Sequence, residues 1–390
     1  MRALFLGLFG LIVAAAAATN PAYAHLGCVD VGEWVAPGSG RIAAREVLSS
    51  AAEQSVVLLG ESHDSADDHR WQLQTVAALA ALRGKVVLGF EMFPRRVQPA
   101  LDRWVAGELG ETEFLAAADW DRVWGYDAPL YMPLFHFARL NRIRMIALNV
   151  EHSFPRAVGA RGFDAVPPEK REGVSAVAPA SEAYLDSLFS IYRKHPNKGR
   201  NPTRSDTEFL RFVQSQLVWD RAFAQAIAEH VERDPAALVI AIMGSGHITY
   251  GHGVPHQLAS LGVTNVASLL PWDANAECHD FSPDLATAVF GVAAALPLPP
   301  RRLLGLMIQT AADGVRVVSV RPGSLARSAG LRVGDVIVEA AGGPVKGTGD
   351  VRSAVESVAP GTWLPLRVKR NGGTIDLVAK FPREKNPAAK

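Results

Sequence analysis

Two apolar runs of strand length in this chain each end on a Gly-x-x-His motif. Residues 55–59 lead into Gly-Glu-Ser-His at residues 60–63, and residues 237–243 lead into Gly-Ser-Gly-His at residues 244–247. A third apolar run leads into Glu91. Uninterrupted apolar runs of this length are typical of strands in a parallel sheet that is covered on both faces. The three runs therefore predict buried strands whose ends carry ionisable side chains.

Four ionisable residues follow these strands, namely Glu61, His63, Glu91 and His247. In open α/β sheets, ligands bind outside the carboxyl ends of the strands, so these side chains are expected at the functional edge of the sheet. Two imidazoles and two carboxylates form a usable set of metal ligands, and they can equally serve as acid and base groups. One Gly-x-x-His motif occurs easily by chance, but two such motifs together with Glu91 indicate a site.

The start of the chain has the pattern of a secretory signal. Arg2 precedes an apolar stretch over residues 3–18, and Ala22-Tyr23-Ala24 predicts cleavage after Ala24. The stretch is shorter than the roughly 20 residues of a typical spanning helix. His25 stands where a bacterial lipobox requires an aliphatic residue, so no lipid anchor is expected on Cys28. We expect an exported, periplasmic protein, with peripheral association with the membrane left open.

The charge balance and the cysteines narrow the classes of function. Forty Lys and Arg against 39 Asp and Glu give a net charge of +1, so the electrostatic footprint of a nucleic-acid-binding protein is absent. The two cysteines, Cys28 and Cys278, both lie in the exported part, where thiols oxidise readily. Either they form a disulfide that ties the mature N-terminus to the end of the first domain, or they are two unpaired buried thiols. The spacing of the two cysteines in the sequence does not decide between these alternatives.

The chain is long enough for two domains after a signal peptide over residues 1–24. A small, proline-rich stretch over residues 291–302 reads as a linker. Before it, strand and helix patterns alternate, which predicts an α/β domain over residues 25–290 with a mostly parallel sheet covered by helices on both faces. The predicted strands cover residues 55–59, 86–90, 143–150, 238–243 and 263–269, and the predicted helices cover residues 69–82, 129–142, 205–231 and 254–261. Residues 153–180 read as a long functional loop or a mobile insertion.

Residues 303–384 resemble a bacterial PDZ domain, and residues 385–390 read as a disordered tail. The resemblance rests on Pro322-Gly323-Ser324, on Gly334-Asp335 and on a closing hairpin around Asn371-Gly372-Gly373. Leu304, Gly305 and Leu306 stand where such domains carry the loop whose backbone N–H groups hold a peptide carboxylate. The alternative is a PDZ fold that only docks onto its own neighbouring domain.

Further candidate ligand contacts surround the first motif. His69 follows it at the start of a predicted helix and could bind iron or zinc. Tyr126 and Tyr131 stand at the entrance to another helix, where aromatic rings could wall a flat ligand and a tyrosine oxygen could serve as an axial haem ligand. Such a cluster can also simply anchor the helix to the core. Gln216 and Asp220 share a face of the long helix, which we expect to be solvated.

The first domain resembles the ChaN family of the haem-binding-uptake, Tiki and TraB superfamily over most of residues 45–275. The resemblance implies an α/β fold, an exported location and haem or iron binding, whereas the wider superfamily uses the same positions for hydrolysis, in some members with a metal. Many ChaN relatives are lipoproteins, and the absent lipobox departs from that pattern. The matching segments are Gly-Glu-Ser-His at 60–63 with His69, Glu91-Met92-Phe93, Tyr131-Met132-Pro133-Leu134, residues 216–224, Gly-Ser-Gly-His at 244–247, and Gly253-Val254-Pro255.

Three functions are compatible with these residues. In the first, the strand ends bind haem or a divalent metal (iron, zinc or manganese), and the PDZ domain recruits a peptide C-terminus. In the second, the protein is a hydrolase in which Glu61 or Glu91 deprotonates water while His63 and His247 hold a metal ion or stabilise the developing charge. In the third, it is an envelope adaptor that acts through its PDZ domain. The expected metal ligands are His63, Glu91, His247 and Glu61, and His69, Tyr126 and Tyr131 are added as haem contacts.

Overall fold

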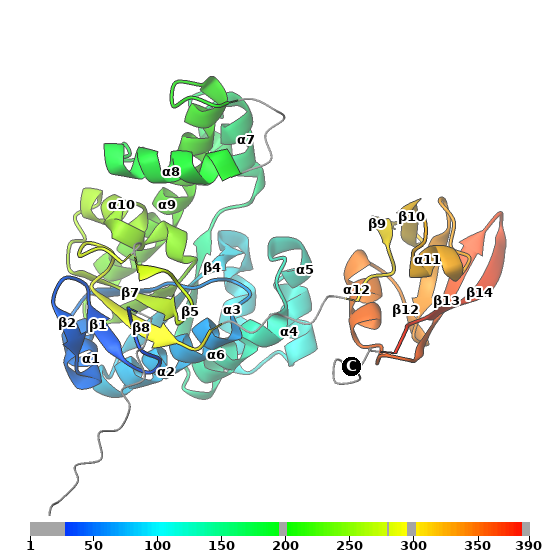
Figure 1. Cartoon of the computed structure of the whole chain (residues 1–390), viewed down its shortest axis with the longest axis horizontal. Helices are drawn as coiled ribbons and strands as arrows, with labels where there is room; N and C mark the ends of the chain where they lie inside the picture. Colours follow the sequence, from blue (N-terminus) through cyan, green and yellow to red (C-terminus); the bar gives the residue numbers. More distant parts are fainter. Residues whose placement is uncertain (1–27, 195–200, 279–280, 295–301, 384–390) are drawn as a thin grey trace, which may run out of the picture. The chain divides into compact units, whose positions relative to one another are not determined.

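The computed structural model describes residues 28–194, 201–278, 281–294 and 302–383. The predicted signal peptide, the predicted C-terminal tail and most of the predicted linker lie outside the described residues. Contacts between Cα atoms divide the chain into two compact units, residues 1–295 and 296–390 (Figure 1). Within the described ranges, no helix has both the length and the apolarity to cross a membrane.

The first unit contains an eight-stranded sheet in the order β2-β1-β8-β7-β3-β6-β4-β5. The pairs β7/β8, β3/β7, β3/β6, β4/β6 and β4/β5 are parallel, and β1 pairs antiparallel with β2 and β8. The prediction of a mostly parallel sheet is confirmed. The strands are β1 (Trp34–Ala36), β2 (Gly40–Ile42), β3 (Val56–Leu59), β4 (Val86–Pro94), β5 (Arg144–Asn149), β6 (Leu238–Ile242), β7 (Val266–Asp273) and β8 (Ala288–Val292).

Helices cover both faces of this sheet, because the buried strands present apolar side chains to each side. Val57 and Leu59 of β3 belong to one core with α1 to α6, whereas Val56 and Leu58 belong to another with α7, α9 and α10. The helices are α1 (Ala44–Ala52), α2 (Ala66–Leu82), α3 (Gln98–Ala106), α4 (Glu111–Ala117), α5 (Trp120–Val123), α6 (Ala128–Leu140), α7 (Ser153–Arg161), α8 (Glu182–Lys194), α9 (Thr207–Arg233) and α10 (Val254–Ser260).

The segment over residues 153–180 differs from the expected irregular loop. It begins with α7, whose Phe154 and Val158 are buried in the core, so the prediction of a loop there was wrong. The rest of the segment is tied to the helices by side-chain amides. Gln257 of α10 exchanges two hydrogen bonds of 2.9 Å with the backbone of Ala178, and these bonds fix the end of the segment against α10.

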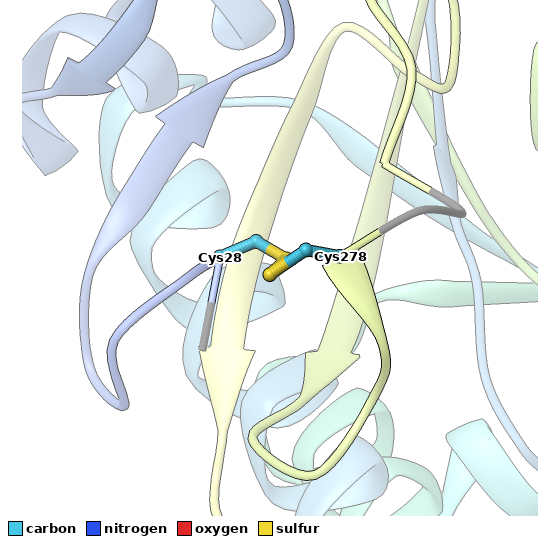
Figure 2. Close-up of a disulfide and its surroundings, with 2 residues drawn as sticks. All are labelled: Cys28 and Cys278. Atoms are coloured by element: carbon cyan, nitrogen blue, oxygen red, sulfur yellow. A yellow bond between two sulfur atoms is a disulfide. The ribbon is translucent and has the colours of Figure 1, made fainter. Parts of the chain in front are cut away.

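Cys28 and Cys278 form a disulfide, with their Cα atoms 5.4 Å apart. Figure 2 shows the bridge, which joins the segment before β1 to the loop that follows β7. Of the two alternatives, the structure therefore has the bridged form. The bond closes a loop with a sequence separation of 250 residues and so fixes the N-terminal edge of the sheet.

The second unit is β-rich, as expected for a PDZ domain. Its antiparallel sheet has the order β14-β13-β11-β10-β9, which leaves β9 and β14 as edges. Asn371 and Gly372 have φ values of +51° and +80°, and this left-handed pair closes the β13–β14 hairpin. The elements are β9 (Leu306–Ala311), β10 (Gly314–Val320), α11 (Leu325–Ser328), β11 (Val336–Ala340), β12 (Gly343–Pro344), α12 (Thr348–Glu356), β13 (Trp363–Arg370) and β14 (Gly373–Lys380).

Candidate functional site

The neighbouring strands β3, β6 and β4 bring His63, His247 and Glu91 together. The Nε2 atoms of His63 and His247 each lie 3.8 Å from Oε1 of Glu91. These three residues line a cavity of about 240 Å³ together with aromatic and polar side chains. The other lining residues are Trp124, Tyr126, Asn149, His152, Gln216, Trp219 and Phe223.

The first glycine of each Gly-x-x-His motif makes this convergence possible. A Cβ atom on Gly60 would lie 2.5 Å from the Leu270 side chain and 2.7 Å from Oγ of Ser245. A Cβ atom on Gly244 would lie 2.9 Å from Cε1 of His63. The motifs therefore require glycine because the strand ends and the imidazole approach each other too closely for a side chain.

His63 is oriented by a carboxylate behind it. Its Nδ1 donates to Oε1 of Glu61 over 2.8 Å, and the buried Glu61 also accepts hydrogen bonds from Tyr131 Oη (2.8 Å) and Gln72 Nε2 (2.9 Å). His69 is buried as well, with Nε2 hydrogen bonded to the carbonyl of His63 over 3.2 Å. Because Nδ1 of His63 is occupied, its Nε2 is the atom that faces the cavity.

His247 is oriented in the same way from the other side. Its Nδ1 donates to Oδ1 of Asp220 over 2.6 Å, and Oδ2 of Asp220 accepts from Tyr184 Oη over 2.7 Å. Asp220 is fully buried, so the expectation of a solvated face on α9 was wrong. The sequence held one signal for this: Phe223 and Ala224, which are buried core residues, lie one turn after Asp220 and so on the same face of α9.

Glu91 is held between the two imidazoles by the backbone. Its Oε2 accepts the N–H of Gly244 over 2.6 Å, and its own carbonyl accepts from Asn149 Nδ2 over 2.8 Å. The first glycine of the second motif thus contributes a hydrogen bond as well as space.

The imidazoles favour the protonated state. Burial lowers the pKa of His247, but the hydrogen bond to Asp220 and the charges of Glu91 and Asp220 outweigh it and raise the pKa to about 9. Burial also lowers the pKa of His63, and the hydrogen bond to Glu61 and the charge of Glu91 raise it above its usual value. Burial would raise the pKa of Glu61, but its bond to His63 and the nearby imidazoles lower it. A ligand that binds at Nε2 of His247 must therefore displace a proton at neutral pH.

The predicted site residues fall into two groups. His63, Glu91, His247 and Tyr126 line the cavity. Glu61, His69 and Tyr131 lie behind His63, and the fully buried Tyr131 has its hydroxyl hydrogen bonded to Glu61, so the structure does not present it to the cavity as an axial ligand.

The predicted four-residue metal set is not assembled. In the part of the chain that the structure describes, no three His, Cys, Asp or Glu side chains are arranged to hold a metal ion. The physical reason is that Glu61 contacts Nδ1 of His63 whereas Glu91 faces Nε2, so the four groups do not surround a common point.

Sequence reasoning missed most of the α9 wall and the polar rim of the cavity. Asn149 and His152 follow no recognisable motif. Trp219 and Phe223 lie in the segment 216–224 that resembles the ChaN family, but they were not singled out as lining residues. The one-turn spacing of Gln216 and Asp220 and the resemblance of residues 216–224 to the ChaN family were the signals for this wall.

In the second unit, Leu304, Gly305 and Leu306 lie at the start of the edge strand β9. Gly305 has a φ of +77°, and a Cβ atom there would lie 2.4 Å from that of Ser324, so only glycine fits. The carbonyls of Leu304 and Gly305 accept from the N–H groups of Ala326 (2.8 Å) and Arg321 (2.9 Å). The loop is thus fixed against the segment that follows β10.

Two family models match the chain. The model described as haem-binding uptake, Tiki superfamily, ChaN matches residues 47–258, and a PDZ domain model matches residues 303–380. A comparison with curated proteins finds no match.

Among solved structures, the chain is similar to one described as cofacial heme binding to ChaN of Campylobacter jejuni, with 16% identity and a TM-score of 0.51, covering 66% of this chain and 95% of that chain. This likeness shows the fold. A PDZ domain of HtrA3 bound to a phage-derived ligand matches with 25% identity and a TM-score of 0.19, covering 20% of this chain and 83% of that one. A serine endoprotease from Yersinia pestis matches with 28% identity and a TM-score of 0.20, covering 22% and 30%.

Proposed function

Since the chain belongs to the haem-binding uptake, Tiki superfamily, ChaN family, we propose that its first domain binds haem through an imidazole at the cavity formed by His63, Glu91 and His247. The observation that carries this proposal is the orientation of the two histidines. Each has Nδ1 anchored on a buried carboxylate, so each offers Nε2 to a cavity with aromatic walls. A second hydrogen bond of this kind fixes the tautomer and raises the basicity of an imidazole that ligates a metal.

The donor set fits haem better than a bare metal ion. Haem iron needs one or two axial ligands and an apolar surface for the macrocycle, and the cavity offers imidazoles and four aromatic rings. Its volume of about 240 Å³ is below the range of pockets that enclose a drug-sized ligand, so haem would be only partly enclosed. His63 is the first candidate for the axial ligand because its side chain is 25% exposed, against 16% for His247.

Titration of the purified mature protein with hemin, followed by the Soret band, tests this proposal. We expect saturable binding that is weakened in His63→Ala or His247→Ala and unchanged in His136→Ala, which removes an exposed histidine that does not line the cavity. Absence of a Soret shift, or equal binding by all three variants, would overturn it.

A second candidate, acid–base hydrolysis, is favoured by one specific observation. Both imidazoles are paired with a carboxylate through Nδ1 and face Glu91 through Nε2. Glu91 would take a proton from water while the imidazolium groups stabilise the developing negative charge. Glu61 is not suited to be the base, since it is buried behind His63. Ester and peptide assays with and without chelator test this function: Glu91→Gln should abolish hydrolysis, and an inert wild type would exclude it for those substrates.

For the second unit, we propose recognition of peptide C-termini. The edge strand β9 can accept an added strand, and the loop at Leu304-Gly305-Leu306 would hold the terminal carboxylate with its amides. Peptides that end in a free apolar residue should bind, and amidation of their C-terminus should weaken binding markedly because it removes a charge. The alternatives are a groove filled by the chain's own linker and a PDZ fold with a purely structural role.

We also propose export to the periplasm, as the pattern of residues 1–24 predicts. The disulfide between Cys28 and Cys278 supports an oxidising compartment. Fractionation of cells that express the full chain should recover it from the periplasm with His25 as its first residue. Recovery from the cytoplasm with residues 1–24 attached would contradict export.

A further inference from the structure

The near-neutral balance of the whole chain conceals a separation of charge between its two units. Residues 296–390 contain fifteen Lys and Arg but only seven Asp and Glu. Residues 1–295, by contrast, contain 25 Lys and Arg and 32 Asp and Glu. The PDZ unit is therefore strongly basic. An excess of this size favours association with acidic partners.

Most acidic side chains of the PDZ unit form ion pairs with cations of a single strand, β13. Four of them pair with cations of β13, a strand that β11 and β10 separate from β9. The pairs are Asp335 with Arg370 (2.7 Å), Glu339 with Arg367 (2.7 Å), Asp376 with Arg367 (2.8 Å) and Asp313 with Lys369 (3.3 Å). A fifth, Asp350, accepts the backbone N–H groups of Lys346 and Gly347 at the start of α12.

Three cations near β9 and α12 have no such partner. Within the described residues, Arg316, Arg321 and Arg352 form no ion pair. Arg316 of β10 lies opposite Gln309 of β9, and the backbone N–H of Arg321 contacts the carbonyl of Gly305.

Arg352 lies on the helix that faces the same strand. It is one turn along α12 from Thr348, whose N–H reaches Oγ1 of Thr310 on β9 over 3.4 Å. Part of the uncompensated positive charge of the unit thus borders the edge strand.

A peptide added to β9 would meet two different surfaces, because its side chains alternate between the faces of the sheet. On the inner face, Leu306 and Ile308 pack with the core, which includes Val351 and Val355 of α12. On the outer face, Met307 is 64% exposed and Gln309 is followed by Arg316 on the next strand. The inner face therefore favours aliphatic side chains of the peptide. On the outer face, Arg316 lies beside the peptide side chains that point the other way.

We propose that the free edge of β9, on the side that α12 faces, binds the C-terminal segment of an acidic protein, ending in an aliphatic residue and carrying carboxylates at alternate upstream positions. This inference rests on the proposed binding of peptide C-termini and adds the chemistry of the partner. Arg316 is the specificity-determining residue, through ion pairs with those carboxylates, and Arg352 adds positive charge on the side of α12.

Fluorescence anisotropy with the mature full chain tests the proposal. The probes are a decapeptide that ends in free valine with Glu at its second and fourth positions from the end, and the same peptide with Gln there. We expect the Glu peptide to bind about threefold to tenfold more tightly at low salt, since surface ion pairs are individually weak, and the difference to shrink in 0.5 M NaCl. Arg316→Glu should remove or reverse the preference. Lys380→Glu, on the opposite edge strand β14, makes the same change in net charge and should leave it unchanged.

The outcomes separate this inference from the function on which it rests. Equal affinity for the Glu and Gln peptides, or an equal effect of Arg316→Glu and Lys380→Glu, overturns the acidic preference while peptide binding stands. Failure of every peptide, both with the full chain and with a variant lacking residues 296–300, overturns peptide binding itself. A preference for the Glu peptide that appears only in that variant supports the inference and shows that the chain's own linker fills the groove.

Discussion

His63 and His247, from two motifs that are far apart in the sequence, direct their Nε2 atoms at the same oxygen of Glu91, each over 3.8 Å. Each imidazole is held from behind by a buried carboxylate, Glu61 or Asp220, and each of these carboxylates accepts a tyrosine hydroxyl. The site therefore consists of two similar chains of hydrogen bonds, each from a tyrosine through a carboxylate to a histidine, and both chains end at Glu91. The affinity of the site for a ligand depends on which of these groups carry protons.

Hemin affinity should increase with pH over the range 6 to 8.5. The pKa of His247 is raised to about 9, so a proton must leave its Nε2 before iron can bind there, and the upward shift of the His63 pKa acts in the same direction. If proton loss from one imidazole limits binding, the affinity rises by up to about tenfold per pH unit below that pKa. Titrations at a series of pH values measure this slope, and an affinity that is flat or falls with rising pH would contradict it.

The free energy of unfolding should fall as the pH rises from about 6.5 to 9. The folded state raises the pKa of His247, so its stabilising interaction is fully present below the pKa of the unfolded chain and is lost as the pH passes the folded value. The loss should amount to about 2–3 kcal/mol. Urea denaturation at several pH values tests this, with His247→Gln as the control in which this part of the pH dependence should disappear.

Gly244→Ala should impair the site, whereas Gly246→Ala in the same motif should not. A methyl group on Gly244 would lie 2.9 Å from His63, but nothing lies within 4 Å of the corresponding position on Gly246. We expect the first variant to lose roughly 1–3 kcal/mol of stability and to bind hemin more weakly, because overpacking displaces the imidazole. Thermal unfolding and hemin titration of both variants provide the comparison, and equal behaviour would argue against the close approach.

Loss of the disulfide should destabilise the first unit. It closes a loop of large sequence separation, and removal of a native bridge typically costs about 2–5 kcal/mol. Cys28→Ser with Cys278→Ser should unfold at lower urea concentration than the oxidised wild type, and reductant should shift only the wild type. An unchanged midpoint would show that the packing of β1 against β8 is sufficient.

Arg370→Met should destabilise the PDZ unit far more than Arg367→Met. Arg370 makes two hydrogen bonds of 2.7 Å to the buried Asp335, so its removal leaves a buried carboxylate unpaired, at a cost of about 3 kcal/mol. Arg367 pairs with Glu339 and Asp376 at the surface, where ion pairs contribute little. Chemical denaturation of the two variants in the full chain checks this order, and a reversed order would contradict it.

Much of the fold could be predicted from the sequence because the buried strands correspond to uninterrupted apolar runs. The same runs placed His63, Glu91 and His247 at strand ends on one edge of the sheet, and the structure shows that β3, β6 and β4 are neighbours there. The side of the imidazole that each carboxylate would contact could not be predicted, because it depends on a hydrogen bond across the motif. Glu61 turns to Nδ1 of His63, and this single contact removes it from the cavity.

The role of Asp220 was hidden for a different reason. A charged residue on a long amphipathic helix is usually solvated, and the one local signal against this was the position of Phe223 and Ala224 one turn further along the helix. Its burial results from the packing of α8 against α9, which brings Tyr184 to one carboxylate oxygen, and from the position of His247 at the other. Contacts between elements far apart in the chain decided this part of the site.

The most direct test of the central claim is a hemin titration of the wild type and of the double variant His63→Ala, His247→Ala, with the Soret band and the stoichiometry as readouts. We expect saturable binding with a shifted Soret band in the wild type and loss of both in the double variant, while the circular dichroism of the two proteins stays the same. Wild-type protein that leaves the spectrum of hemin unchanged, or a folded double variant that binds as the wild type does, would contradict it.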